Sequence, residues 1–449
     1  MPPKHLKIPM ENTHHSLISE GVPECEQTLH TEKPFWVFLG GNSGIATWLI
    51  GVLIAGMGLD VTNALVVIFI GSLVGSFLPA LTATMGPKSG LSQIEASRFS
   101  LGRSGKKLPA VLNWFNAIGW DVINNIISAS AFVVLLAEYS VNVPMWLSLG
   151  ILVLIQLIIG IYGHHLIQNT AKYTSSLLVF FFLIIGIVAM QKVGLQTLQQ
   201  LPPDITHTLS ALILLVAYNL GWATCTADYT RYLPKSTPSK TVFLTVFTPL
   251  FLSLLVFAFF GYMTASAVKE QTPEGVMIAL QTLSGQFAPI VLLLVWFTAI
   301  PANALNDNSA AYTLISCGFK FSRPTSAVFG AVIGYVISLL ATHSFVIFFE
   351  DFLFLFAHWV APWAGVVLVH WFMVGQYNRL TPEGITAGCI IMLSVSIVSL
   401  ALFSVNPLYT GPGAELLGDL DIGPYLGFFM SAGLYYALLN KRDKYSTLD

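Results

Sequence analysis

Long apolar runs separated by short polar segments fill the chain from about residue 35 to residue 440. These runs reach the length of about 20 residues that a helix needs to cross a bilayer. Helices pair all of their backbone groups within such a run, and the short alternating segments of a transmembrane β-barrel do not occur. We therefore predict an all-α membrane protein of about twelve transmembrane helices. The predicted spans, numbered 1 to 12, are 35–58, 63–86, 108–137, 143–165, 172–193, 207–227, 241–266, 287–316, 324–344, 346–374, 383–404 and 422–440.

The two ends of the chain break this pattern. Residues 1–33 are polar and lack periodicity, and no apolar core follows their basic start. They are predicted to be a disordered tail rather than a signal peptide. Residues 34–449 then form a single transmembrane domain.

Composition agrees with lipid as the main solvent. The 449 residues are 55% hydrophobic and 9% charged, whereas a soluble domain carries roughly 25% charged residues. The basic residues are scattered, which argues against a nucleic-acid partner. The four cysteines form no CxxC pair, so we expect neither a disulfide framework nor a metal site. Nothing in the sequence indicates an oligomeric state.

Lys and Arg predict the orientation, because cytoplasmic loops carry an excess of both. If the N-terminus is cytoplasmic, all but Lys192 and Lys269 of the 20 basic residues fall on the cytoplasmic side. We therefore predict an integral protein of the plasma or inner membrane with both termini in the cytoplasm.

Spans 1 and 6 contain helix-weakening sequences. Span 1 contains Gly40–Gly44, in which three glycines flank two polar residues, and span 6 contains the pair Gly221-Trp222. Transporters place broken helices at the bilayer midplane, where freed backbone groups bind substrate or ion. Close packing of helices through small residues is the alternative for span 1. Beyond the pair in span 6, Asp228 and Arg231 lie three residues apart and are expected to pair at the cytoplasmic boundary.

Span 3 carries Trp120, Asp121 and Asn124. Trp120 and Asn124 are four residues apart and share one helix face. An aromatic plane beside an amide suits a flat heterocycle, which stacks on the ring while the amide reads its edge. Asp121 points elsewhere, and a carboxylate this deep in a membrane is either a functional group or a paired structural one.

Span 8 concentrates polar side chains near its middle. Asn303, Asn306, Asp307 and Asn308 lie within six residues. Such a cluster cannot face lipid, so part of it lines a cavity or contacts another helix. At least one of these residues is expected to bind substrate.

The unusual spans are related by their numbers. Spans 1 and 6 contain the breaks, and spans 3 and 8 contain the polar clusters. Adding five to the number of span 1 or span 3 gives the number of its counterpart, span 6 or span 8. An inverted repeat of five plus five helices requires this relation. We predict this LeuT-like arrangement, with repeat one over about 35–193, repeat two over about 207–374 and two extra helices in 383–440.

Several motifs resemble the nucleobase–cation symport-1 family, in its purine and cytosine permease branch. Gly86–Gln93 and Ser97–Gly102 resemble the loop between its spans 2 and 3. Gly119–Asn124 resembles its span 3 motif, Ala227–Pro234 its span 6 exit, and Asn306–Asn308 its span 8 sequence. The likeness covers roughly residues 35–330.

The resemblance implies alternating access and a substrate site. Trp120, Asn124 and Trp222 would contact the nucleobase, as would Asn306 or Asn308. The broken part of span 1 would add groups from Asn42, Ser43, Ala46 and Thr47.

Two departures from the family bear on the coupling ion. Sodium-coupled members carry hydroxyl residues where this chain has Ala304 and Leu305. Asp121 stands where a small or hydroxyl residue is expected, and a deep carboxylate is a plausible proton carrier. H⁺ is therefore favoured over Na⁺, with Asp121 and Asp307 as the candidates for proton coupling.

The predicted function is secondary transport of cytosine or a purine with a cation, without chemistry on the substrate and without a cofactor. The alternative keeps the fold and carries another planar heterocycle, such as hydantoin, allantoin, a thiamine-precursor pyrimidine or a vitamin. A membrane enzyme is less favoured because no nucleophile or cofactor motif is evident. The chain has no Walker A sequence, so ATP-driven transport is not expected. A channel would not explain paired broken helices as well.

Overall fold

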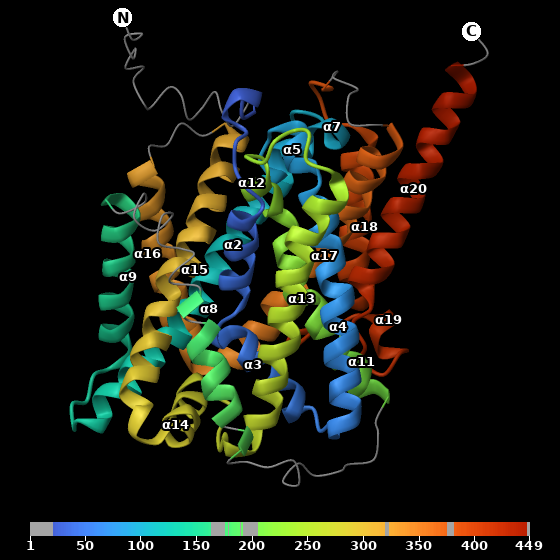
Figure 1. Ribbon diagram of the computed structural model, residues 1–449. Helices are drawn as coiled ribbons and strands as arrows, with labels where there is room; N and C mark the ends of the chain where they lie inside the picture. The colour runs from blue at the N-terminus through green and yellow to red at the C-terminus, as the bar shows by residue number, and fades with distance from the viewer. Residues whose placement is uncertain are drawn as a thin grey trace, which may run out of the picture.

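A computed structural model describes residues 21–162, 176–177, 179–188, 190–191, 205–318, 323–374 and 381–446. Figure 1 shows a bundle of helices that run roughly along one axis. The start of α2 (Glu32–Asn42) and the end of α20 (Gly423–Ser446) lie at the same end of this bundle, at the top of the view. Predicted span 5 is described in part, and within it Val179–Val188 is helical.

Most predicted spans correspond to single long helices. Their boundaries agree with the predictions to within a few residues. These helices are α4 (Val61–Ala83), α8 (Lys107–Glu138), α9 (Met145–Tyr162), α13 (Ser239–Thr264), α15 (Ala288–Cys317), α16 (Arg323–Ala341), α17 (Phe345–Val369), α18 (Ala387–Phe403) and α20.

Spans 1 and 6 are interrupted, as their glycines predict. Span 1 consists of α2 and α3 (Ile45–Gly56), which are bent by 47° across Ser43 and Gly44. Span 6 consists of α11 (Ile205–Leu220), one 3₁₀ turn, η3 (Gly221–Thr224), and the short α12 (Thr226–Thr230). The predictions of a break at Gly40–Gly44 and at Gly221-Trp222 are confirmed.

Short elements connect the long helices, and the apolar-run criterion did not predict them. They lie mostly at the two ends of the bundle. They are η1 (Glu24–Glu26), α5 (Met85–Ser89), α6 (Gln93–Ala96), α7 (Arg98–Leu101), η4 (Ala265–Ala267), α14 (Pro273–Ser284), η5 (Gly285–Phe287), η6 (Thr342–Ser344), the π-helical η7 (His370–Val374), the strands β1 (Val405–Asn406) and β2 (Tyr409–Thr410), and α19 (Pro412–Glu415). The two strands pair antiparallel as a hairpin.

The outer surface is apolar along the helices. Phe69, Phe77, Leu154 and Leu340 are among many large hydrophobic side chains that are exposed. Within the described residues, six helices are long and apolar enough to cross a membrane, or seven when α2 and α3 count as one span. Exposed apolar surface on this scale requires lipid as its partner.

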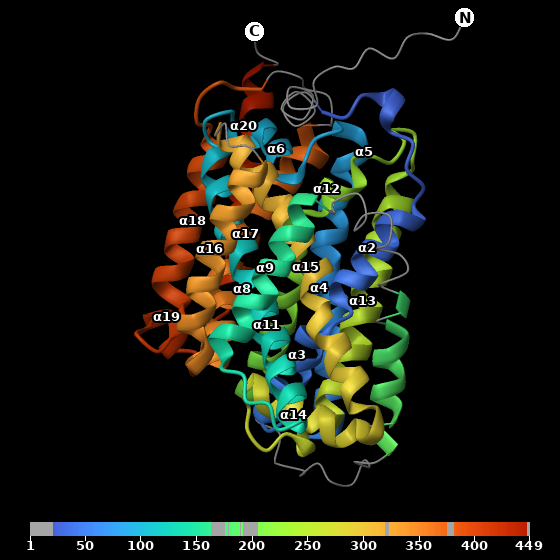
Figure 2. The ribbon, with the colours of Figure 1, turned by 90° about the vertical axis from the view of Figure 1, so that its left-hand side faces the viewer.

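Two groups of helices make up the interior (Figures 1 and 2). In the first group, α13 packs against α2, α3 and α4, and α4 also packs against α11. In the second group, α8 packs against α9, α15 and α16. This second group supplies the polar clusters of spans 3 and 8, and the first supplies both breaks.

The C-terminal helices pack on α17, and buried hydrogen bonds join them. His358 Nδ1 lies 2.6 Å from Ser399 Oγ of α18, and its Nε2 lies 2.9 Å from Asp421 Oδ2, just before α20. His370 Nδ1 lies 2.8 Å from Tyr435 Oη of α20. The two histidines of span 10 therefore act in helix packing rather than as ligands of one site.

Glycines bring α3 and α13 into backbone contact. A Cβ atom on Gly51 would lie 1.9 Å from the carbonyl oxygen of Ala258, and one on Gly261 would lie 1.8 Å from that of Trp48. Small residues allow this close approach, which drives helix association where lipid gives no hydrophobic force.

Gly261→Ala is expected to lower the apparent melting temperature of the purified protein by several degrees. The added methyl group forces the helices apart, and overpacking of this kind costs about 1–3 kcal/mol. Gly433→Ala on α20 is the control, because a Cβ atom there meets nothing within 4 Å. Equal melting temperatures for the two variants, measured by intrinsic fluorescence in detergent, would contradict the packing role.

Candidate functional site

The break in span 1 leaves backbone groups without helical hydrogen bonds, and a side chain pairs with one of them. Gly44 is fully extended, with φ −148° and ψ −178°, between α2 and α3. Thr47 Oγ1 donates to the carbonyl oxygen of Asn42 at 2.6 Å and lies 2.7 Å from Tyr218 Oη of α11. The hydroxyl of Ser43 is buried and has no hydrogen-bond partner within the described part of the chain. This hydroxyl is therefore available to a ligand at the break.

The Asn42 side chain ties the two broken spans together. Its Nδ2 is within bonding distance of Asn219 Oδ1 (3.0 Å), Ser253 Oγ (2.8 Å) and the carbonyl oxygen of Leu250 (3.3 Å). Its Oδ1 accepts a hydrogen bond from Trp222 Nε1 at 3.0 Å. One amide thus joins the end of α2, the end of α11, the η3 turn and α13, and it is only 1% exposed.

The indole of Trp222 lies close to a glycine of span 1. A Cβ atom on Gly41 would come within 2.7 Å of the indole. Phe38 contacts the same indole edge-on, with ring centroids 5.5 Å apart. Trp222 is half-buried rather than buried, although its indole N–H is satisfied by Asn42.

Trp120 approaches the break of span 6 from α8. A Cβ atom on Gly221 would lie 3.2 Å from Trp120 Nε1. The indole also contacts Tyr218, Phe349 and Phe352 edge-on, at centroid distances of 5.4, 6.3 and 5.6 Å. Trp120 therefore packs against Gly221, the residue before Trp222, while the Trp222 indole lies against Gly41 of span 1.

The amides of α15 face in different directions. Asn303 is 2% exposed and bonds with Asn124 and Asn125 of α8 and with Gln156 of α9. Asn306 Nδ2 donates to Asp121 Oδ1 at 3.0 Å. On the other side of the helix, Asn308 lies near the hydroxyl group of Tyr229 of α12.

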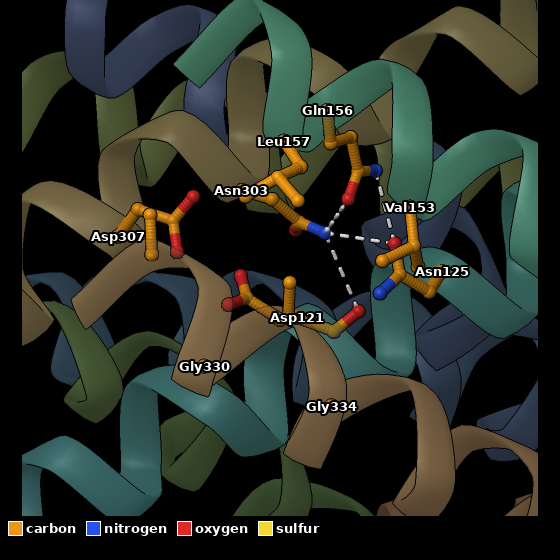
Figure 3. A pocket seen from close by; sticks show the side chains of 11 residues that line it. Asp121, Asn125, Val153, Gln156, Leu157, Asn303, Asp307, Gly330 and Gly334 are labelled. Atoms are coloured by element: carbon orange, nitrogen blue, oxygen red, sulfur yellow. Dashed lines mark hydrogen bonds between the residues drawn. The ribbon is translucent and has the colours of Figure 1, made fainter. Parts of the chain in front are cut away.

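A small polar cavity lies inside the second helix group (Figure 3). The carboxyl groups of Asp121 and Asp307 face it, together with the amides of Asn125, Gln156 and Asn303. Gly330 and Gly334 of α16 form part of its wall. The space is about 20 Å³, and a single water molecule needs about 10–15 Å³. The cavity therefore suits one water-sized particle and is too small for a nucleobase.

Leu305 occupies the face of α15 that looks toward the break of span 1. Its Cδ1 would lie 3.1 Å from a Cβ atom on Gly41, and its carbonyl oxygen accepts a hydrogen bond from Tyr229 Oη at 3.1 Å. An apolar side chain therefore stands where the resemblance places hydroxyl ligands for sodium. Among the described residues, no group of three or more His, Cys, Asp or Glu is arranged to hold a metal ion.

The predicted pair of Asp228 and Arg231 is wrong. Asp228 Oδ1 instead accepts from the backbone N–H of Gln93 at 2.8 Å, in the loop between spans 2 and 3. Arg231 is buried between the rings of Tyr232 and Tyr312, 4.9 and 4.5 Å from their centroids. The Asp228 carboxylate is bonded to the Gln93 backbone, and the Arg231 guanidinium packs between two tyrosine rings instead of forming a hydrogen bond with Asp228.

Sequence reasoning missed Gln156, Asn125 and Asn219. Gln156 is the lone amide in the apolar run Met145–Tyr162, and that isolation was the available signal. Asn125 and Asn219 adjoin residues that were recognised, but their partners lie on other helices.

A family model described as permease for cytosine/purines, uracil, thiamine and allantoin matches residues 21–383. YxlA of Bacillus subtilis, assigned as a purine-cytosine permease, is 26% identical over 446 residues, which cover 95% of this chain and 96% of the relative. The purine-cytosine permease fcyB of Emericella nidulans is 24% identical, covering 93% of this chain and 87% of the relative. The vitamin B6 transporter TPN1 of Saccharomyces cerevisiae is 23% identical, covering 75% of this chain and 60% of the relative.

Solved structures share the fold at low sequence identity. Mhp1, a nucleobase-cation-symport-1 family transporter solved in a closed conformation with bromovinylhydantoin bound, has a TM-score of 0.75 at 17% identity and covers 95% of each chain. A Na⁺-coupled sialic acid symporter has a TM-score of 0.61 at 14% identity, covering 94% of this chain and 91% of its own. Because these neighbours carry different cargo, the fold alone does not identify a substrate.

Asn42→Ala is expected to lower the apparent melting temperature by several degrees and to abolish ligand binding. The change removes the donors to three buried acceptors and leaves the Trp222 N–H unpaired, and each buried unsatisfied group costs about 1–3 kcal/mol. The control is Asn116→Ala, since Asn116 is equally an amide buried in the bundle but donates only one long bond of 3.4 Å. Unchanged stability of Asn42→Ala would show that the junction contributes nothing.

Proposed function

Because this chain belongs to the family of permeases for cytosine/purines, uracil, thiamine and allantoin, we propose that it imports cytosine or a purine together with a cation by alternating access. The chain is an integral membrane transporter. The observation that carries the choice of cargo is the packing of the Trp120 indole against Gly221, the residue that precedes Trp222 in the broken part of span 6. Two indoles beside amide side chains provide stacking and edge recognition for a flat heterocycle.

The proposed substrate site combines residues from both helix groups. Trp120 and Trp222 stack on the base, and Asn124, Asn306 and Asn308 supply amide contacts. At the break of span 1, Asn42, Ser43, Ala46 and Thr47 lie in the segment that would face the substrate or ion. The free hydroxyl of Ser43 supports a role for this segment.

The proposed architecture is twelve transmembrane helices with a five-plus-five inverted repeat. The matching interruptions of spans 1 and 6 support it, as does the packing of span 3 on span 8 as α8 on α15. The helices α18 and α20 lie outside the repeat. We place the protein in the plasma or inner membrane with both termini in the cytoplasm. The common location of the first residues of α2 and the last of α20 supports termini on one side.

H⁺ is the favoured coupling ion, and Asp121 and Asp307 are its proposed carriers. A water-sized cavity between two carboxyl groups suits a proton better than a substrate. The apolar Leu305 beside Gly41 argues against a sodium site at the break. Coupling follows from Asn306, which donates to Asp121 Oδ1. When Asp121 gains a proton, this amide loses part of its acceptor and can turn toward the base.

A second candidate cargo is another planar heterocycle. The likeness to a vitamin B6 transporter and to a transporter with a bound hydantoin favours this alternative. It requires the same site and the same fold.

Uptake of radiolabelled cytosine into proteoliposomes tests the proposal. A proton gradient and a sodium gradient are imposed in turn, and adenine, hypoxanthine, uracil and hydantoin serve as competitors. Uptake driven by the proton gradient and blocked by unlabelled cytosine is the expected result. Uptake of hydantoin or vitamin B6 without any of cytosine would reject the nucleobase proposal.

Asp121→Asn is expected to bind cytosine and to exchange it across the membrane, but to lose accumulation driven by a proton gradient. The amide keeps the size of the side chain and cannot carry the proton. The measurement compares gradient-driven uptake with counterflow exchange in the same vesicles. Asp60→Asn at the end of span 1, where Asp60 caps α4, is the matched control. Full accumulation by Asp121→Asn would make Asp121 a structural group.

A further inference from the structure

Asn303 connects the acidic cavity to Asn124, and both the nitrogen and the oxygen of its side-chain amide form hydrogen bonds. Its Nδ2 lies 2.9 Å from Asn125 Oδ1, 3.4 Å from Gln156 Oε1 and 3.4 Å from the carbonyl oxygen of Asp121 (Figure 3). Its Oδ1 accepts a hydrogen bond from Asn124 Nδ2 at 2.9 Å. Asn303 is 2% exposed, so it has little surface left for a ligand.

A backbone carbonyl determines where the NH₂ group and the oxygen of the Asn303 side chain lie. A carbonyl oxygen can only accept a hydrogen bond, so the group facing the Asp121 carbonyl must be the NH₂ of Asn303. Two further acceptors surround the same nitrogen, which has two hydrogens. Turning the amide over would set its oxygen against the backbone carbonyl oxygen of Asp121, which cannot turn with it, and two buried acceptors facing each other are costly.

The orientation of the Asn303 amide determines the orientation of the Asn124 amide. Since Asn303 presents its oxygen, Asn124 must present its NH₂ in return, and the oxygen of Asn124 is then the end free to face a ligand. Asn124 follows Trp120 by one helical turn on the same face of α8. Among the described residues, no hydrogen bond occupies Asn124 Oδ1.

We propose that Asn303 is a positioning residue that holds Asn124 with its oxygen toward the ligand, so that the site selects nucleobases with an amino group at that edge. Cytosine and adenine present an N–H donor there, next to a ring-nitrogen acceptor. Uracil and hypoxanthine present an oxo group in the same place. An amide paired with an amino group and the neighbouring ring nitrogen is the arrangement by which Asn reads adenine in nucleic acids. The inference rests on the proposed function and adds its substrate class.

A mismatched edge sets two acceptors against each other in a buried site. Sites built around a hydrogen bond discriminate strongly against analogues that leave their polar groups unpaired. A difference of about tenfold or more in affinity is therefore expected between the amino and oxo member of each pair.

The test is competition binding with labelled cytosine on the purified full-length protein. Affinities for cytosine, uracil, adenine and hypoxanthine are measured for the wild type, Asn303→Leu and Asn113→Ala. The wild type is expected to bind the amino base about tenfold more tightly in each pair. Asn303→Leu frees Asn124 to turn over, so both ratios should fall to about threefold or less. Asn113→Ala removes another buried amide between α8 and α15, bonded to Ser309 at 3.3 Å, and should keep the wild-type ratios.

The selectivity ratio separates positioning from a general structural effect, which would weaken all four bases alike. Unchanged ratios in folded Asn303→Leu would overturn the proposal, as would a wild-type preference for uracil or hypoxanthine. If Asn303→Leu does not fold, Asn303→Ser replaces it in the test, because a serine side chain is too short to reach Asn124. The same fall in both selectivity ratios is expected for that variant. A wild-type protein that binds hydantoin or vitamin B6 but none of the four bases would reject the proposed function and this inference together. Binding with the wrong ratios rejects the inference alone.

Discussion

The absence of water in the bilayer interior governs this structure, because every polar group there must find its partner within the protein. The breaks in spans 1 and 6 are possible only where side chains take over the lost helical bonds. Thr47 caps a freed carbonyl, and Asn42 holds both broken segments to α13. The same requirement aligns the amides between α8 and α15, where one backbone carbonyl sets the direction of two side chains. Satisfaction of buried groups thus builds the site and orients it at once.

The sequence predicted the long helices and both breaks because these depend on local features. Apolar length identifies a span, and glycine beside polar residues identifies a break at Gly40–Gly44 or Gly221. The partners could not be read in this way. Asn42 and Trp222 are 180 residues apart, and Asn303 meets Gln156 of a span that looks purely apolar. The pairing expected for Asp228 and Arg231 was wrong for the same reason, since the loop residue Gln93 supplies the competing partner.

In the proposed mechanism, one helix group binds the cargo and the other carries the ion. The first group contains the interrupted helices and presents Trp222 and Ser43. The second contains the acidic cavity, which has no room for a base. Trp120 belongs to the second group yet packs against the Gly221 turn of the first. A substrate at this boundary would touch both groups, while an ion in the cavity would touch only one. The amides of Asn124, Asn303 and Asn306 join α8 to α15 within the second group.

The proposed proton coupling also has an electrical consequence. Cytosine and adenine are uncharged at neutral pH, so a single proton carried with each base makes every cycle move one positive charge. One charge crossing a membrane at 100 mV is worth about 2.3 kcal/mol, which corresponds to a concentration ratio of roughly fifty. One proton carried by the Asp121 and Asp307 pair with each base would thereby let the membrane voltage set how far the cell can concentrate its nucleobase, even when the pH on the two sides is equal.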